Sequence, residues 1–295
     1  MPSVARTGWA VLGSLAIGAL GALPALAGNE PSLAEIVNRA GAYVRQFDQD
    51  FAVVLSDERY DQTQLLNQRV TRRKMTSEML FMWVPEEHAW LTVRNVLTVD
   101  QAAIPDSRER LERTLADPRP NTLTRLRLLA DEGARFNLGR IYRNFNDATL
   151  ALRFLEPAQQ PRFTYTMAGQ EKMNGSAVWK ITFAEHALPT VISLDGENWP
   201  SAGAAWVDAD GVVMRTALTL VDPKTNTHAS IVVSYRRDPK LDMWVPGRME
   251  ETYTRVAAGR LAPQQVRIIS ERITCVAIYS NFRRFETAGR IVSPK

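Results

Sequence analysis

The sequence predicts an α+β fold in which about ten strands form one large, strongly curved antiparallel sheet, a half-barrel. Three observations lead to this prediction. Apolar residues at helical spacing open the mature chain, alternating apolar and polar residues dominate 51–100 and 161–280, and a helical, charge-rich stretch at about 104–155 interrupts the strands. We expect the N-terminal helix and this helical insertion to cover the concave side of the sheet.

Residues 1–27 have the pattern of a signal peptide. Arg6 precedes the apolar run WAVLGSLAIGALGALPALA, and Pro24 comes just before the small-residue site Ala25-Leu26-Ala27. An uncleaved anchor is the alternative, because 19 mostly apolar residues approach the ~20 that span a bilayer. We expect cleavage before Gly28 and a periplasmic or secreted protein that is not integral to the membrane.

Length and composition indicate that residues 28–295 form a single large domain. The chain is 45% hydrophobic and 23% charged, which is ordinary for a globular protein with a substantial core. A net charge of +4 is too mild to indicate nucleic-acid binding. Cys275 is the only cysteine, so the chain cannot form an internal disulfide, and its place in an alternating run predicts a buried structural thiol.

The first element of the mature chain is an amphipathic helix. Its apolar positions are Leu33, Ile36, Val37, Ala40, Val44, Phe47 and Phe51. Ser32 and Glu35 form an S-x-x-E capping box, which satisfies backbone N–H groups of the first turn.

Strands and further helices follow in a clear order. SEMLFMWVP at 77–85 is apolar on both faces and LTVRNVLTV at 91–99 on one, so the former needs cover on both sides. The segments 106–117 and 122–136 predict two helices, and 147–157 predicts a short third turn that ends before Pro157.

The remainder of the chain reads as strands joined by short turns. Apolar and polar residues alternate, as in strands, in seven segments: RFTYTM, AVWKITFAE, AAWVD, GVVMRTALTLV, SIVVSYRRD, GRMEETYTRV and QVRIISERITCVAIYS. The connections hold Asp, Gly, Pro and Asn, and their short lengths indicate antiparallel neighbours.

Three carboxylates are candidates for chemistry. Asp208 and Asp210 precede Gly211 as in a calcium loop, but the remaining ligand positions of that loop are missing, so we predict a tight hairpin turn. Glu185 falls on the apolar face if the alternation of its strand continues, where its pKa would be raised; we favour the alternative that the strand has ended and Glu185 is in water.

Motifs of known catalytic and metal sites are missing. There is no H-E-x-x-H, H-x-H, G-x-S-x-G or S-x-x-K string and no Gly-rich phosphate loop. We therefore expect no enzyme activity, metal or cofactor.

Aromatic residues in the predicted strands can line an apolar cavity or fill the sheet core. If a cavity exists, the expected lining residues are Phe81, Trp83, Trp179, Phe183 and Met214, with the helices from Arg108 to Ala134 as a moving lid.

The order of these elements resembles the periplasmic lipoprotein-carrier fold of LolA and its relatives LolB and RseB. The best local sequence match to that family is the W-x-D-x-x-G-x-x-x-R string at Trp206, Asp208, Gly211 and Arg215. The resemblance implies a curved half-barrel covered by helices, with hydrophobic space for lipid or acylated protein. This chain is longer than a typical carrier, and no family site residue can be carried over to it.

These expectations lead to three functional hypotheses. The first is a non-enzymatic exported protein that binds a lipid, an acyl chain or a lipoprotein, in outer-membrane lipoprotein sorting or envelope sensing. The second is a structural or sensory module with a filled core that binds another envelope protein. The third is a hydrolase that uses at least two of Glu185, Asp208 and Asp210.

Overall fold

The computed structural model describes residues 30–117, 121–141, 143, 147–194, 196–222, 224–262 and 265–285. The predicted signal peptide, 1–27, lies outside these residues. Contacts divide the chain into the units Met1–Glu30 and Pro31–Lys295, and the fold below is that of the second unit. Within the described residues, no helix combines the length and apolarity needed to cross a bilayer.

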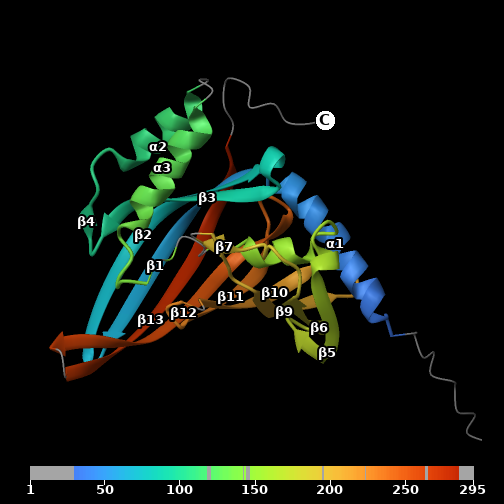
Figure 1. The fold of residues 1–295 in the computed structure, drawn as a ribbon. Helices are drawn as coiled ribbons and strands as arrows, with labels where there is room; N and C mark the ends of the chain where they lie inside the picture. Colours follow the sequence, from blue (N-terminus) through green and yellow to red (C-terminus); the bar gives the residue numbers. More distant parts are fainter. Residues whose placement is uncertain are drawn as a thin grey trace, which may run out of the picture. The chain divides into compact units, whose positions relative to one another are not determined.

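Eleven strands form one open antiparallel sheet in the order β4-β3-β2-β1-β13-β12-β11-β10-β9-β6-β5 (Figure 1). They are β1 (Val53–Leu66), β2 (Arg69–Val84), β3 (Ala89–Val99), β4 (Ala102–Ala103), β5 (Phe163–Met173), β6 (Ser176–Glu185), β9 (Ser201–Asp208), β10 (Val213–Asp222), β11 (Thr227–Asp238), β12 (Met243–Ala262) and β13 (Gln265–Arg284). The short strands β7 (Ser193–Leu194) and β8 (Glu197–Asn198) pair separately. The predicted class, an α+β fold with a large antiparallel sheet, is confirmed.

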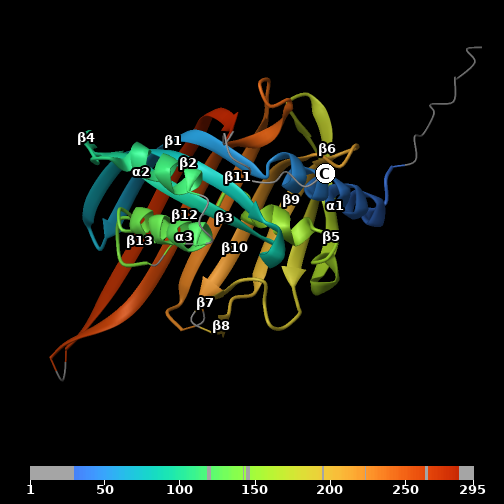
Figure 2. The same ribbon diagram turned by 90° about the horizontal axis from the view of Figure 1, so that it is seen from above.

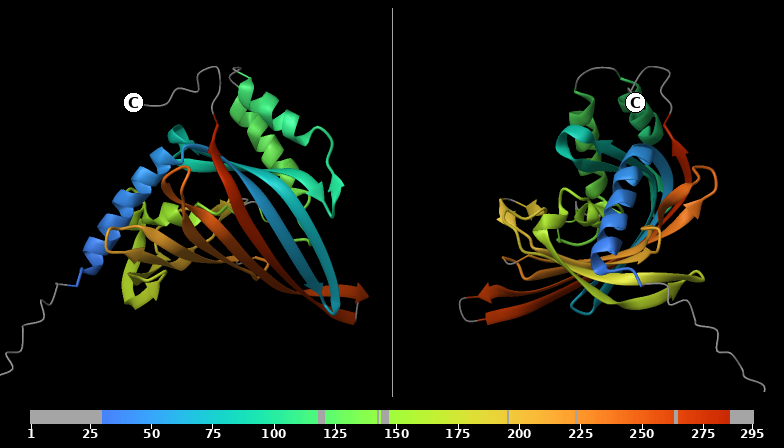
Figure 3. Two further views of the ribbon diagram at one scale, coloured as in Figure 1. Left: turned by 180° about the vertical axis from the view of Figure 1, so that it is seen from behind. Right: turned by 90° about the vertical axis from the view of Figure 1, so that its right-hand side faces the viewer.

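Helix α1 (Leu33–Asp50) begins at the predicted capping box. The Ser32 hydroxyl accepts a hydrogen bond from the Glu35 backbone N–H at 3.3 Å, and the Glu35 carboxylate accepts one from the Ser32 N–H at 2.7 Å. The apolar stripe of α1 is buried against one face of the sheet, and the sheet curls around this helix (Figure 3). We call the face that α1 covers the inner face.

Strand β2 shows how the two faces of the sheet are covered. Met79 and Phe81 belong to the core under α1, whereas the alternating residues Leu80, Met82 and Val84 belong to a separate apolar cluster on the outer face. The prediction that this strand is covered on both sides is therefore confirmed.

The outer cluster is completed by α2 (Ser107–Ala116) and α3 (Thr122–Ala134), which lie over β2 and β3 (Figure 2). Their buried leucines are Leu111, Leu115, Leu126 and Leu129. The expectation that these helices cover the concave side is wrong, because an apolar stripe predicts burial but does not say against which face. They are accordingly not a lid over the inner core.

The end of the insertion does return to the inner face. The 3₁₀ helix η2 (Leu150–Leu155) buries Leu152, Phe154 and Leu155 in the same core as α1. Two shorter 3₁₀ helices, η1 (Pro85–Glu87) and η3 (Gln160–Arg162), connect neighbouring elements. The predicted insertion at about 104–155 is thus divided between the two faces of the sheet.

Around β5, β6 and η2 the inner face is filled by aromatic side chains. Phe154 packs against Phe163 and Phe183 with ring centroids 5.2 and 5.6 Å apart, and Phe183 is 3% exposed. Trp179 is 9% exposed in the same core. The hairpin between β5 and β6 turns at Asn174 and Gly175, both at positive φ, inside the predicted connection.

Candidate functional site

A cluster of buried polar residues occupies the inner face around β1, β3, β12 and β13. We call it the buried polar cluster, and it consists of Glu58, Tyr60, Gln62, Arg94, Arg143, Glu251, Tyr253 and Cys275. Alternation brings them together, since Tyr60 and Gln62 follow Glu58 at period two, and Gln62 and Glu251 both lie opposite Cys275. The cluster holds two carboxylates and two guanidinium groups.

Glu58 and Arg94 form a buried bidentate ion pair. The Arg94 Nε and Nη2 atoms donate to the two Glu58 carboxylate oxygens at 2.7 and 2.8 Å, and the Glu58 side chain is fully buried. The Arg94 guanidinium also lies 4.0 Å from the Tyr60 ring centroid. Burial opposes the charge on Arg94, but Glu58 and Tyr60 hold its pKa well above the ordinary value.

Glu251 is bound by two tyrosine hydroxyls. Tyr60 donates to one carboxylate oxygen at 3.0 Å and Tyr253 to the other at 2.5 Å. Burial, reinforced by the nearby Glu251 charge, raises the pKa of both tyrosines well above the ordinary value. Both phenols therefore remain neutral donors that hold the carboxylate in place.

Arg143 enters the cluster from the segment that follows α3. It is 2% exposed, and its guanidinium donates to Cys275 Sγ at 2.9 Å, Gln62 Oε1 at 2.9 Å and the Leu138 carbonyl at 2.8 Å. Burial raises the pKa of the Cys275 thiol to about 11. Cys275 is a buried, neutral thiol, as predicted, and is not a nucleophile at neutral pH.

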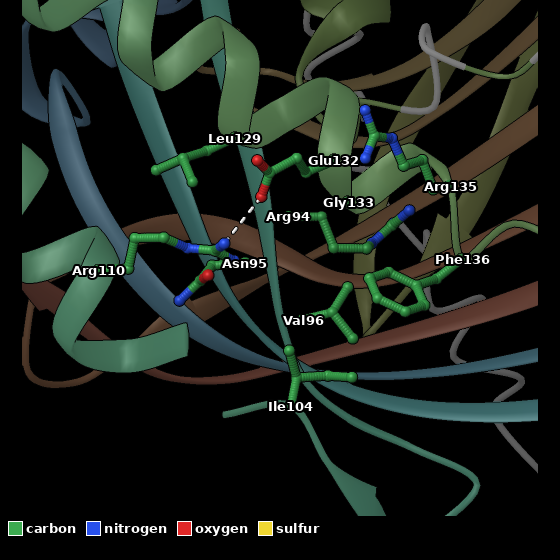
Figure 4. Close-up of a pocket in the computed structure, with 10 residues that line it drawn as sticks. All are labelled: Arg94, Asn95, Val96, Ile104, Arg110, Leu129, Glu132, Gly133, Arg135 and Phe136. Atoms are coloured by element: carbon green, nitrogen blue, oxygen red, sulfur yellow. Dashed lines mark ion pairs between the residues drawn. The ribbon is translucent and has the colours of Figure 1, made fainter. Parts of the chain in front are cut away.

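Gly133 fixes α3 against β3 at the open edge of the sheet. A Cβ at this position would come within 2.2 Å of the Arg94 carbonyl oxygen, so only glycine allows such a close approach. A pocket of about 160 Å³ lies on one side of this contact (Figure 4). Arg110 and Glu132, an ion pair of 2.9 Å, lie at its rim.

A larger pocket of about 310 Å³ also borders Arg94 at the β3 edge. Met79, Trp90, Leu91 and Ala130 supply its apolar wall. Its polar groups come from Arg94 and Arg143 of the buried polar cluster and from Asn137 and Asp147. Burial raises the pKa of Asp147 above its ordinary value. The pocket is amphipathic, and its volume is near the lower end of the ~300–1,000 Å³ typical of small-molecule sites.

The side chains predicted to line a cavity lie elsewhere. Phe81 is fully buried against Phe51 and Tyr279, and Trp83 contacts Trp90 with the two ring planes tilted by 59°. Trp179 and Phe183 belong to the aromatic part of the inner core, as described above. Met214 is on the outer face, in a cluster with Val178 and Trp206, so the five residues do not share one face. None of them lines either pocket at the β3 edge.

The segment Asp208 to Gly211 forms the predicted tight turn. Asp208 Oδ1 accepts hydrogen bonds from the backbone N–H groups of Asp210 at 3.0 Å and Val212 at 2.8 Å. Gly211 has φ +92°, and a Cβ there would meet the backbone of Arg39 at 2.6 Å. Arg39 in turn donates to the Ala209 carbonyl at 2.7 Å, so the turn also anchors α1.

The Glu185 side chain is buried, and the expectation that it is in water is wrong. Its side chain is fully inaccessible and accepts hydrogen bonds from the N–H groups of Val191 at 2.6 Å and Ser201 at 3.2 Å, with Arg162 at 3.8 Å. The β6–β9 register places Glu185 and Asp208 at opposite ends of that strand pair. These two carboxylates therefore do not converge in one cleft.

Metal ligands do not gather anywhere in the described part of the chain: no group of three His, Cys, Asp or Glu side chains there could hold an ion. Sequence reasoning missed the residues of the buried polar cluster. The available signal was the alternation Glu58, Tyr60, Gln62 in a segment between apolar strands, which is the pattern of a strand with a polar buried face.

Comparisons with known proteins give similar solved structures at low identity and low TM-score. No family model and no curated protein matches the chain. A putative outer membrane lipoprotein-sorting protein domain from Vibrio parahaemolyticus is a similar solved structure, at 10% identity and TM-score 0.34, covering 86% of this chain and 94% of that one. A DUF1329 family protein from Desulfovibrio piger is similar at 11% identity and TM-score 0.31, covering 84% and 92%.

A third similar structure, described as lipid-protein interactions in lipovitellin, has 8% identity and TM-score 0.26. The match covers 81% of this chain and 26% of that chain. All three TM-scores are below 0.5, and at 8% to 11% identity these matches show no family and no role for this chain.

Proposed function

We propose that this chain is an exported, non-enzymatic protein that binds an acyl chain or another lipid moiety in the pocket at the β3 edge. The observation behind this proposal is the amphipathic lining of that pocket, with Trp90, Leu91 and Ala130 on its apolar side and Arg94 and Arg143 on its polar side. Guanidinium groups only donate hydrogen bonds, so the polar part of the ligand needs acceptor oxygens.

The pocket volume limits the ligand to one chain or head group. Each methylene removed from water contributes about 0.8 kcal/mol, so a chain of about eight buried carbons contributes roughly 6 kcal/mol before ordering costs. Export rests on the signal-peptide pattern of residues 1–27, and the periplasm is the compartment that we propose. A role in lipoprotein sorting or envelope sensing would follow from such binding.

Native mass spectrometry of the exported protein, followed by lipid extraction, tests for a bound amphiphile. A titration with dodecanoate, followed by calorimetry, then measures binding to the emptied protein. Ala130→Trp fills the pocket and should weaken binding by at least about tenfold. Leu128→Trp is the control, because Leu128 is 58% exposed on the same helix. A protein that retains no amphiphile and ignores dodecanoate, or an Ala130→Trp variant that folds and binds normally, would contradict the proposal.

The aromatic filling around Phe183 favours a second candidate, an envelope interaction module without a ligand. In that case both variants would behave like the wild type in the titration, and a partner protein would co-purify with the exported chain.

A further inference from the structure

The hairpin of β12 and β13 extends beyond both of its neighbours in the sheet. The pairing of β1 ends with Leu66 opposite Glu271, and β11 begins at Thr227 opposite Arg255. Arg255 and Glu271 themselves lie opposite each other. Past this row, 256–262 and 265–269 run on as a two-stranded ribbon on the order of 15 Å long (Figure 1). We call this part the projecting hairpin.

Large apolar side chains are exposed on the outer face of this end of the sheet. Val256 is 56% and Ile268 68% exposed on the projecting hairpin, and Leu65 and Val70 are 39% and 49% exposed beside its base. Register places them on one face: Val70 is opposite Leu65, Leu65 is opposite Arg272, and Ile268 is four residues from Arg272. We call these four residues the tip patch.

The surroundings of the tip patch are cationic. Arg72 and Arg272 are exposed on the same face. The stretch 254–272, TRVAAGRLAPQQVRIISER, contains four arginines and one acidic residue, Glu271. That glutamate is buried and ion-paired with Arg255 at 3.1 Å, so it does not neutralise Arg72 or Arg272.

We propose that the tip patch docks this protein onto a bilayer surface that contains anionic lipids. The transfer of exposed aliphatic side chains from water into the head-group boundary is favourable, and neighbouring arginines are attracted to anionic head groups. A two-stranded ribbon is marginally stable alone in water, and a surface that covers it would stabilise it. A nucleic acid would match the arginines but would leave the four aliphatic side chains without a contact.

This inference stands independently of the pocket at the β3 edge. Val70 and Met79 are nine residues apart on β2, which corresponds to about 30 Å of strand. Val70 faces outward, whereas Met79 faces inward and borders the pocket. Membrane docking and ligand binding can therefore be lost separately.

Vesicle flotation tests the proposal with the exported chain. Wild type and variants are compared in the same processed form, verified by intact mass, on phosphatidylcholine vesicles with and without phosphatidylglycerol. Val256→Glu combined with Ile268→Glu should lower partitioning onto the anionic vesicles by at least about tenfold. Each of Arg72→Gln and Arg272→Gln should lower it about fivefold, an effect that added salt removes. Leu128→Glu, an exposed apolar site on α3, is the control and should change nothing.

A local probe decides the case in which the double glutamate variant fails to fold. Because Cys275 is 1% exposed, the variant Ile268→Cys can be labelled at one site with an environment-sensitive dye, with Leu128→Cys as the control. We expect a blue shift on anionic vesicles for position 268 alone. Four outcomes would overturn the proposal. They are equal binding to both vesicle types, unchanged binding of the folded double variant, and no shift of the dye at position 268. The fourth is self-association that the double variant abolishes, without any vesicle binding by the wild type.

Discussion

The inner face of the sheet has two regions that differ in chemistry although one continuous sheet forms both. Around β5, β6 and η2, phenylalanine rings and Trp179 fill the space, and Phe183 is 3% exposed. Around β1, β3, β12 and β13, the inward positions hold Glu58, Arg94 and Glu251 with their hydrogen-bond partners. Curvature therefore does not decide whether such a sheet encloses a site; the side chains at its inward positions do.

The difference teaches where to look for function in this fold. Apolar side chains can collapse into a core and leave no space, whereas a buried polar cluster must keep fixed geometry to satisfy every charge. The pocket of about 310 Å³ borders the polar region and not the aromatic one. Four predictions can break or sharpen this comparison.

The largest effect should come from the ion pair. Glu58→Ala leaves Arg94 buried without its carboxylate and should lower the free energy of unfolding by about 3–5 kcal/mol. Urea denaturation measures this loss. Combining Glu58→Leu with Arg94→Met should recover most of it, because no unpaired charge then remains. If Glu58→Ala alone were as stable as the wild type, the polar region would not be buried in solution.

A pH-dependent effect should follow from Asp48, on α1. Burial, with a smaller contribution from Glu156, raises its pKa from 3.8 to about 7. Folding therefore favours the protonated form, so wild-type stability should fall as the pH rises from about 4 to 7. Asp48→Asn should be more stable than the wild type by about 2–4 kcal/mol at pH 8 and nearly equal to it at pH 4. Thermal melts across this range measure the difference, and a constant difference would contradict the shift.

In the aromatic region, Phe183→Leu should lower stability by about 1–1.5 kcal/mol, equally at every pH, because it perturbs packing without exposing a charge. Dodecanoate binding should remain unchanged. If Phe183 instead lines a ligand cavity, as the sequence suggested, the same variant would alter binding with little change in stability.

The smallest effect should be at the β9–β10 turn. Asp208→Ala removes the acceptor for two backbone N–H groups and should cost about 1 kcal/mol in the free energy of unfolding. Asp210→Ala is the matched control, since Asp210 is exposed in the same turn, and it should be nearly neutral. Loss of ligand binding in either variant would revive a functional role for these aspartates.

Much of the fold could be predicted because local patterns determined it. The capping box of α1, the two helices of the insertion, the two-faced strand at 77–85 and the Asp208 turn depend on residues close in the sequence. Their physics is local hydrogen bonding and periodic burial.

The site could not be predicted because it depends on packing between distant segments. The sequence did not predict β1 as a separate strand, because its buried residues Glu58, Tyr60 and Gln62 are polar and resemble a solvent-exposed segment. Met214 and the insertion helices were predicted to lie on the inner side. Alternation shows that a strand has two faces, but it does not show which of them is the inner one. Arg143 became recognisable only through its contacts with Gln62 and Cys275.

The position of β13 has a consequence for how the chain is made. It is the last of the described strands along the chain, yet it lies between β12 and β1 and joins the N-terminal strands β1–β4 to the remaining strands of the sheet. Pairs so distant along the chain form slowly, because loop closure must precede their contacts. A chain that is synthesised from its N-terminus would leave one edge of β1 unpaired until β13 has been made, so a truncation before β13 should leave two parts of the sheet that do not pair and are prone to aggregate.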